Sequence, residues 1–195
     1  MSFFTEHLNN EELEYLEKNT VFSSDEIVYL FNRFCYLDRR KCGYLSYTDF
    51  QLIPEFVSNP FCDLIVGYIE EYITEDEKLN FAYFLDFLKL FHAATPKSAR
   101  INYLFNLFDL NKDHKLCIKV LSKIMQIIGV KEAENAAGET LKQYDIGQKG
   151  FLDIFDFTRL YNEDDNLEKI LVIDFKKNIF VPERAVGLID IFWGN

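Results

Sequence analysis

Oxygen-bearing side chains recur at alternate positions near the middle of the chain. Asp109, Asn111 and Asp113 are each two residues apart, and the backbone carbonyl of Lys115 continues the same phase. Calcium and magnesium are hard cations with oxygen ligands, and a twelve-residue loop supplies them to calcium at positions 1, 3, 5, 7, 9 and 12. Residues 109–120 therefore predict a loop for a divalent cation.

This loop lacks two features that strong calcium binding needs. Position 12 normally provides a carboxylate with two ligand oxygens, but here it is Val120, which has none. Position 6 is normally Gly, which allows a sharp turn, whereas here it is His114. We therefore expect only weak occupancy by calcium or magnesium in this loop.

A second loop, residues 145–156, keeps carboxylates at positions 1, 9 and 12, namely Asp145, Asp153 and Asp156. Positions 3 and 5 are Gly147 and Lys149, which removes two ligands and adds a positive charge. The short Asp at position 12 suits magnesium better than calcium. Any metal site in this loop is also predicted to be weak or vestigial.

These two loops belong to a four-fold repeat. In four segments a Leu is followed five residues later by Phe or Leu, and each segment is flanked by apolar residues at helical spacing. The repeated residues are Leu45, Leu79, Leu116 and Leu152, at spacings of 34, 37 and 36 residues. A helix, a twelve-residue loop and a second helix in about three dozen residues is typical of an EF-hand.

The fold class that we predict is all-α, with two lobes of paired EF-hands and about ten helices. The apolar residue at position 8 of each loop should form a short two-stranded ribbon with its partner, which pairs Leu45 with Leu79 and Leu116 with Leu152. The loop at residues 38–49 has Arg40 at position 3 and Cys42 at position 5, and residues 72–83 have no acid at position 1 or 12. Both should have lost the metal.

Composition excludes several other functions. The net charge of −11 disfavours nucleic acid and anionic lipid as primary partners. There is no signal-like N-terminus, no apolar run long enough to span a membrane, and Ser2 stands where N-myristoylation needs Gly. We therefore expect a cytoplasmic protein. The four cysteines have no zinc-type spacing, and we expect them to be reduced and buried.

Enzymatic activity is the weakest hypothesis. No GxxxxGK, HExxH or GxSxG motif is present, and the three histidines have no evident catalytic partner. We predict that the protein is not an enzyme.

Several short motifs resemble the calcium- and integrin-binding proteins. Residues 53–61 (IPEFVSNPF) resemble a stretch that follows the first loop both in that family and in calcineurin B and its homologous proteins. Residues 84–113 are most similar to the calcium- and integrin-binding family, and residues 21–27, 33–35 and 165–173 also fit. The missing insertion in the first hand is more similar to the calcineurin-B-homologous type, so both families stay open.

The resemblance implies an N-terminal lobe at residues 1–92 and a C-terminal lobe at residues 98–175, with Pro96 breaking the helix between them. It also implies an adaptor that binds an amphipathic helix, such as a cytosolic segment of an integrin, an ion channel or another membrane protein. The alternative is a calcineurin-B-type regulatory subunit of a phosphatase or a sodium/proton exchanger. The proposed partner groove is lined by Phe84, Phe87, Phe91, Phe105, Phe108, Phe155 and Phe157.

The C-terminal tail, residues 176–195, has no clear counterpart in either family. Ala185, Leu188, Ile189 and Phe192 fall on one stripe of a short helix, and Trp193 lies beside it. We expect this tail helix to fold back as a lid on the apolar groove.

Overall fold

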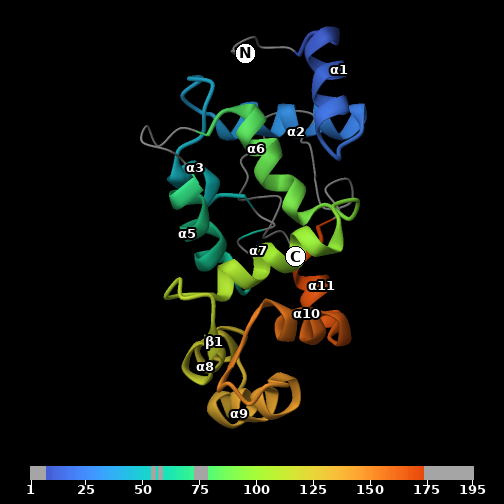
Figure 1. Cartoon of the computed structure of the whole chain (residues 1–195). Coiled ribbons are helices and arrows are strands. Elements are labelled where there is room, and N and C mark those ends of the chain that lie inside the picture. The colour runs from blue at the N-terminus through green and yellow to red at the C-terminus, as the bar shows by residue number, and fades with distance from the viewer. Residues whose placement is uncertain (1–7, 54–55, 57–58, 73–78, 174–195) are drawn as a thin grey trace, which may run out of the picture.

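The computed structural model describes residues 8–53, 56, 59–72 and 79–173, and all of the described secondary structure is helical apart from short β pairings. The first part of the chain contains α1 (Asn10–Asn19), α2 (Ser24–Leu37), α3 (Tyr47–Phe50), α5 (Cys62–Tyr72), α6 (Phe81–Leu88) and the 3-10 turn η1 (Lys89–Phe91). The second part contains α7 (Lys97–Phe108), β1 (Leu116–Cys117), α8 (Ile118–Ile127), α9 (Ala133–Tyr144), β2 (Phe151–Leu152), α10 (Ile154–Glu163) and α11 (Asp165–Leu171). Figure 1 shows α1, α2 and α6 above α7, α5 beside it, and α8, α9 and α10 below it.

Local side chains decide where several of these helices begin. Asn9 and Glu12 form a reciprocal capping box at the start of α1, and Asp153 and Asp156 do the same for α10. Asn80 caps α6, because its side-chain oxygen accepts the Tyr83 N–H at 3.0 Å. These caps satisfy backbone donors that have no partner within the helix.

The predicted pairing of the loops is confirmed. β1 and β2 are antiparallel, with Leu116 opposite Leu152. Leu45 and Leu79 form an isolated antiparallel bridge, in which each backbone N–H donates to the other residue's carbonyl at 2.9 and 3.0 Å. The part of the chain that the structure describes holds ten α-helices, in agreement with the predicted all-α EF-hand class.

The core is a single cluster of apolar side chains that runs from one half of the molecule to the other. Tyr103 of α7 packs edge-on against Tyr68 and Phe91, with ring centroids 5.0 and 5.5 Å apart. Phe108, five residues further along α7, packs against Phe61 of the first half and Phe157 of the second, with ring centroids 5.0 and 5.9 Å apart. α7 is thus shared by the two halves. The predicted division into lobes at residues 1–92 and 98–175 remains a prediction.

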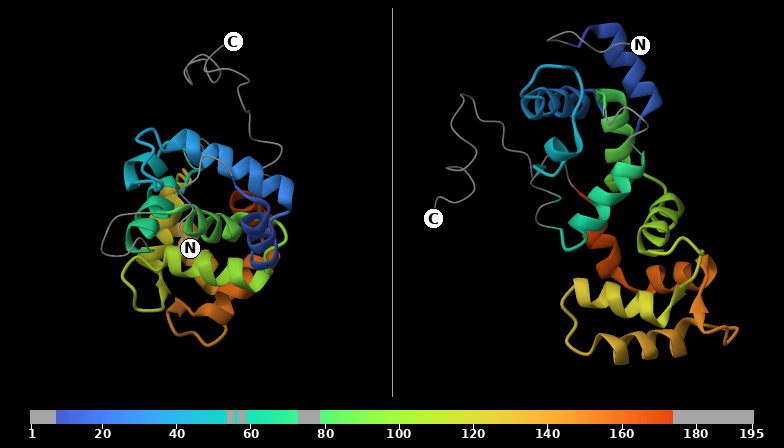
Figure 2. Two further views of the ribbon diagram at one scale, coloured as in Figure 1. Left: turned by 90° about the horizontal axis from the view of Figure 1, so that it is seen from above. Right: turned by 90° about the vertical axis from the view of Figure 1, so that its left-hand side faces the viewer.

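Polar contacts also join the two halves. The Asn59 side chain donates to the Ile170 carbonyl at 3.0 Å, and the Ile173 N–H donates to the Phe91 carbonyl at 2.8 Å. α11 therefore leads the chain back to the first half. Figure 2 shows α8 and α9 side by side at the end of the molecule opposite to α1 and α2. The tail at residues 176–195 lies outside the described residues.

Candidate functional site

Three of the four predicted loops share one backbone conformation. At positions 4 and 6 of each loop the backbone angle φ is positive, between 50° and 81°. The residues concerned are Lys41 and Gly43 in loop 1 (residues 38–49), Lys112 and His114 in loop 3 (residues 109–120), and Gln148 and Gly150 in loop 4 (residues 145–156). His114 has φ 57°, so it occupies the turn position that Gly occupies in the other two loops, as the sequence predicted.

The aspartate at position 1 closes each of these loops from within. Asp38 accepts the backbone N–H groups of positions 5 and 6 at 3.1 and 2.6 Å. Asp109 does so at 3.2 and 2.8 Å, and Asp145 at 3.0 and 2.7 Å. Desolvation raises the pKa of Asp145, but these two donors and the charge of Lys149 outweigh it and lower the net pKa. The loop shape therefore has a source other than a bound cation.

Loop 3 contains the best set of predicted ligands, although its last position contributes none. Asp109 is buried, whereas Asn111 and Asp113 are exposed, and the Asp113 carboxylate accepts the Lys115 N–H at 2.9 Å. Val120 is only 8% exposed and belongs to the hydrophobic core. Within the residues that are described, no group of three or more His, Cys, Asp or Glu side chains is arranged to hold a metal. Weak binding of calcium or magnesium at this loop remains a prediction.

In loop 4 a lysine pairs with two of the three predicted carboxylate ligands. The Lys149 ammonium lies 2.5 Å from an Asp153 oxygen and 2.6 Å from an Asp156 oxygen. The Asp156 side chain is only 5% exposed, so its negative charge is balanced where water has little access. Hydrogen bonds to the two carboxylates raise the pKa of Lys149, and Lys149 in turn lowers the pKa of Asp153.

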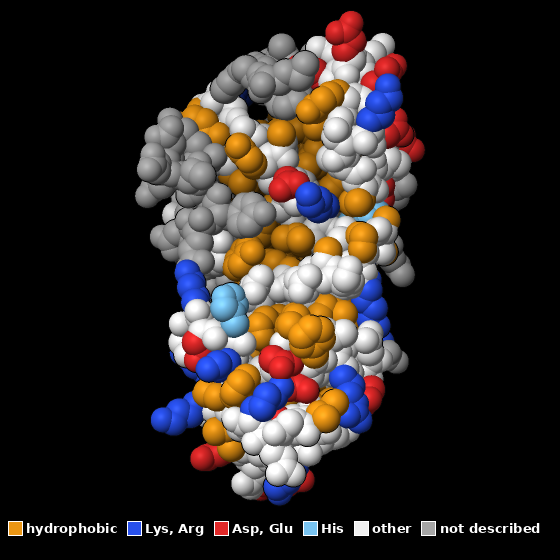
Figure 3. All heavy atoms as spheres, viewed as in Figure 1, with side chains coloured by type: hydrophobic (Ala, Val, Ile, Leu, Met, Phe, Trp, Pro, Cys, Tyr) orange, Lys and Arg blue, Asp and Glu red, His pale blue; other side chains and the backbone are white. Residues whose placement is uncertain are grey.

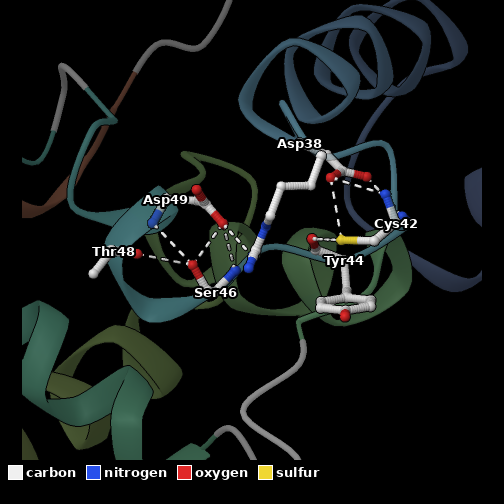
Figure 4. A network of polar contacts seen from close by, with 8 residues as sticks. Asp38, Cys42, Tyr44, Ser46, Thr48 and Asp49 are labelled. Carbon is white, nitrogen blue, oxygen red and sulfur yellow. Dashed lines mark hydrogen bonds and ion pairs between the residues drawn. The ribbon is translucent and has the colours of Figure 1, made fainter.

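Loop 1 has a similar arrangement built from a different position. Arg40, at position 3, lies with a guanidinium nitrogen 3.1 Å from an oxygen of Asp49, at position 12. Ser46 donates to the same oxygen from its backbone N–H and its hydroxyl, at 2.8 and 2.6 Å. Figure 4 shows Asp49 and Ser46 at one end of the loop and Asp38 with Cys42 at the other. Desolvation raises the pKa of Asp49, but Ser46 and Arg40 together make the net shift downward.

Sequence reasoning identified Arg40 as a lost ligand, and Lys149 as a lost ligand that adds a positive charge. It missed that each reaches the acid at position 12 of its own loop. A signal was available, because a long basic side chain at an inner ligand position accompanies an acid at position 12 in both loops.

The aromatic residues that were predicted to line a partner groove fall into two groups. Six are buried at 0–3% exposure in the hydrophobic core: Phe84, Phe87, Phe91, Phe105, Phe108 and Phe157. Phe155, in the first turn of α10, is 81% exposed. The six core residues therefore do not form an exposed groove in this structure. The role of the predicted groove in partner binding remains a prediction.

Other parts of the prediction had mixed outcomes. The expectation of buried cysteines is wrong for Cys35, which is exposed on α2, and the other three are only half-buried. Loop 2 (residues 72–83) is described only at its two ends, and residues 73–78 lie outside the description. Among the helices that are described, none is long and apolar enough to cross a membrane.

Comparison with known proteins gives the family. No protein-family model matches the chain. It is 30% identical to the type 2 calcineurin B of Dictyostelium discoideum over 174 residues, which cover 86% of this chain and 94% of that protein. It is 27% identical to the calcineurin B of Naegleria gruberi, with 90% of each chain covered, and 22% identical to the type 1 calcineurin B of Dictyostelium discoideum, with 87% and 96% covered.

These relatives favour the calcineurin B side of the two resemblances, while the specific likeness to calcium- and integrin-binding proteins remains a prediction. They are distant, but the match with the type 2 protein covers 86% of this chain. Because these relatives are calcineurin B subunits, the match identifies a regulatory protein and not an enzyme. The chain belongs to the calcineurin B family of EF-hand proteins.

Proposed function

We propose that this protein is a calcineurin-B-type regulatory subunit that binds an amphipathic helix of a catalytic partner chain, with weak or no dependence on calcium. The observation that carries this proposal is the extent of the match, which spans 94% of the type 2 calcineurin B of Dictyostelium discoideum. The match covers 86% of this chain, whereas metal ligands are replaced at Arg40, Cys42, Val120 and Lys149. A framework that persists without its ligands fits a protein whose work is binding another chain.

The mode of binding follows from the helical pairs. Paired EF-hands can separate to expose an apolar groove, into which an amphipathic helix lays its apolar face. The six buried phenylalanines of the predicted groove would then exchange core contacts for contacts with the partner. Figure 3 shows hydrophobic side chains gathered on the middle of one face, around α6 and α7, where a helix could make its first contacts. Each large side chain that becomes buried contributes about 1.5–3 kcal/mol.

Charge selects the kind of helix. The net charge of −11 favours a partner segment whose apolar stripe is flanked by Lys and Arg. Such complementarity raises the association rate and disfavours acidic segments. A phosphatase catalytic chain of the calcineurin type is the partner that the relatives support best, and a sodium/proton exchanger tail belongs to the same proposal.

A cytoplasmic location is part of this proposal. A cytosolic segment of an integrin or ion channel would present the same type of helix, and binding it would bring the protein to the membrane. Experiment can distinguish a phosphatase or exchanger partner from an integrin or channel segment, because only the former has phosphatase or exchanger activity.

The test is purification of the tagged full-length chain from cells in the presence of a calcium chelator, followed by mass spectrometry and by reconstitution with the partner found. We expect a phosphatase catalytic chain or an exchanger to co-purify equally well with and without calcium. Recovery of an integrin or channel tail would instead support the adaptor function. Binding that disappears in chelator would refute calcium independence.

A matched pair of surface variants tests the groove. Phe155→Ser removes an 81% exposed side chain of the predicted groove, and Ile146→Ser removes a 72% exposed side chain outside it. We expect the first to weaken partner binding by about tenfold, which corresponds to the partial burial of one aromatic ring, and the second to have little effect. Equal effects of both substitutions would place the contact elsewhere.

A further inference from the structure

Two departures from the ligand pattern of loop 4 act together in the structure. Lys149 folds its aliphatic chain across Gly147, so that a Cβ atom added to Gly147 would lie 3.2 Å from the Lys149 Cγ and 3.4 Å from its Cδ. The first separation is tighter than ordinary van der Waals contact and the second lies at its limit, so a side chain at position 3 would require the lysine stem to shift by a few tenths of an ångström. Gly147 needs no unusual backbone angle, and the absence of its side chain therefore serves to make room for Lys149.

The ammonium that reaches the loop in this way takes over a contact that a metal makes in an active EF-hand. The acid at position 12 normally binds the metal and thereby ties the second helix to the loop. Here Asp156 binds Lys149 at 2.6 Å, and the other contact of the ammonium, at 2.5 Å, is with Asp153, the residue that caps α10. A covalently attached cation thus links loop 4 to the start of α10.

In loop 1 the residue at position 3 makes the equivalent contact. The Arg40 guanidinium binds Asp49 at 3.1 Å and lies 5.9 Å from the centre of the Tyr44 ring. Each half of the molecule thus has one loop in which the acid at position 12 is neutralised by a basic side chain of the same loop. That the two loops use different positions, 3 and 5, shows that the contact does not depend on one shared substitution.

We propose that Lys149, with Gly147 as the space that admits it, is a built-in replacement for the metal ion of the fourth EF-hand and keeps the C-terminal pair of hands in one conformation at every calcium concentration. Arg40 does the same for the first hand. A tethered cation is present at a constant and high effective concentration, so it needs no calcium signal. A divalent cation must displace it before binding, which lowers the apparent affinity of the loop for metal. This inference concerns the loops alone and holds whichever partner the protein binds.

The test uses Lys149→Met in the full-length chain, because Met keeps an apolar stem but removes the charge. The matched control is Lys142→Met, which removes an ammonium paired with Glu139 at 2.6 Å on the exposed surface of α9. Melting temperatures are measured in chelator and in millimolar calcium or magnesium. In chelator, we expect Lys149→Met to melt several degrees lower than the wild type. We expect divalent cations to raise the melting temperature of Lys149→Met by more than they raise that of the wild type or of the control.

Two results would overturn the proposal. One is a Lys149→Met variant that melts like the control in chelator. The other is a wild-type chain that divalent cations stabilise as much as they stabilise the variant, because its loop would then be open to metal.

A measurement on the unmodified chain covers the case in which Lys149→Met does not fold. The side-chain ammonium of Lys149 should give a resolved proton–nitrogen NMR signal, since its two carboxylate partners slow its exchange with water. The signal is assigned to Lys149 by its loss in Lys149→Arg, a variant that keeps the charge. We expect the signal to persist unchanged in millimolar calcium. Absence of the signal, or its displacement by calcium, would refute the proposal.

Discussion

Arg100 offers the sharpest test of how α11 is held against α7 and the segment that precedes it. Its side chain is 7% exposed, and one guanidinium nitrogen donates to the carbonyls of His92 and Ala93 at 3.3 and 3.2 Å and also to that of Thr95. The other terminal nitrogen pairs with Glu168 of α11. Arg100→Met would remove every one of these contacts while retaining much of the apolar stem.

The expected loss follows from the burial of these groups. Removing one partner of a buried ion pair costs about 3–5 kcal/mol, because the other charge remains without a partner. Glu168 is 31% exposed and regains part of its hydration, which lowers the cost, whereas the carbonyls around the guanidinium each lose a donor. We therefore expect the free energy of unfolding to fall by about 2–4 kcal/mol. The melting temperature should fall by about 5–15 °C for a chain of this size.

The assay is urea unfolding followed by circular dichroism, and the control is Arg159→Met. Arg159 also pairs with a glutamate, Glu163, at 3.2 Å, but the two side chains are 47% and 46% exposed. An exposed pair of this kind contributes less than about 1 kcal/mol. If Arg100→Met lost no more stability than Arg159→Met, the buried pair would not hold α11 against the segment before α7, and the reasoning would be refuted.

Three further predictions concern the loops, the core and the tail. Val120→Glu combined with His114→Gly should raise the calcium affinity of loop 3 by orders of magnitude, measured by calorimetry. In chelator the double substitution should destabilise the chain, because position 120 is buried. Unchanged affinity would contradict the assignment of loop positions. Phe157→Ala should cost about 3–5 kcal/mol in urea unfolding, whereas Phe155→Ser should change stability by less than about 0.5 kcal/mol; similar losses would mean that the two burials are misassigned. Deletion of residues 179–195 should tighten binding of a partner helix and increase fluorescence of a hydrophobic dye, while weaker binding would place the tail in the partner interface.

The repeat in the sequence was enough to predict the fold class and the pairing of the loops. Each EF-hand is a local unit, and its apolar spacing, turn residues and helix caps are encoded within about three dozen residues. The pairing of Leu116 with Leu152 follows because two neighbouring loops of this kind place position 8 side by side. The left-handed conformation of His114 is equally local, since the loop demands a turn at that position whichever residue occupies it.

The roles of individual side chains depended on contacts between distant residues. Sequence alone treated the phenylalanines of the predicted groove as one set, yet packing buries Phe157 at 0% and leaves Phe155, two residues earlier, 81% exposed. Neighbours on one helix face different surroundings according to which side meets the core. Likewise, α7 is shared between the halves because Tyr103 and Phe108 find partners on helices far away in the chain.

The candidate site shows the same division. The sequence by itself determined which metal ligands are missing, because ligand chemistry depends on residue type and position. Only the folded loop decided what replaces them. Lys149 reaches Asp156 because the backbone turns at Gln148 and Gly150, and because its side chain packs against Gly147, which has no side chain. In the sequence, Lys149 is a basic residue at a ligand position and counts as a lost ligand. In the folded loop, its ammonium lies 2.6 Å from Asp156, the acid that a metal would have bound.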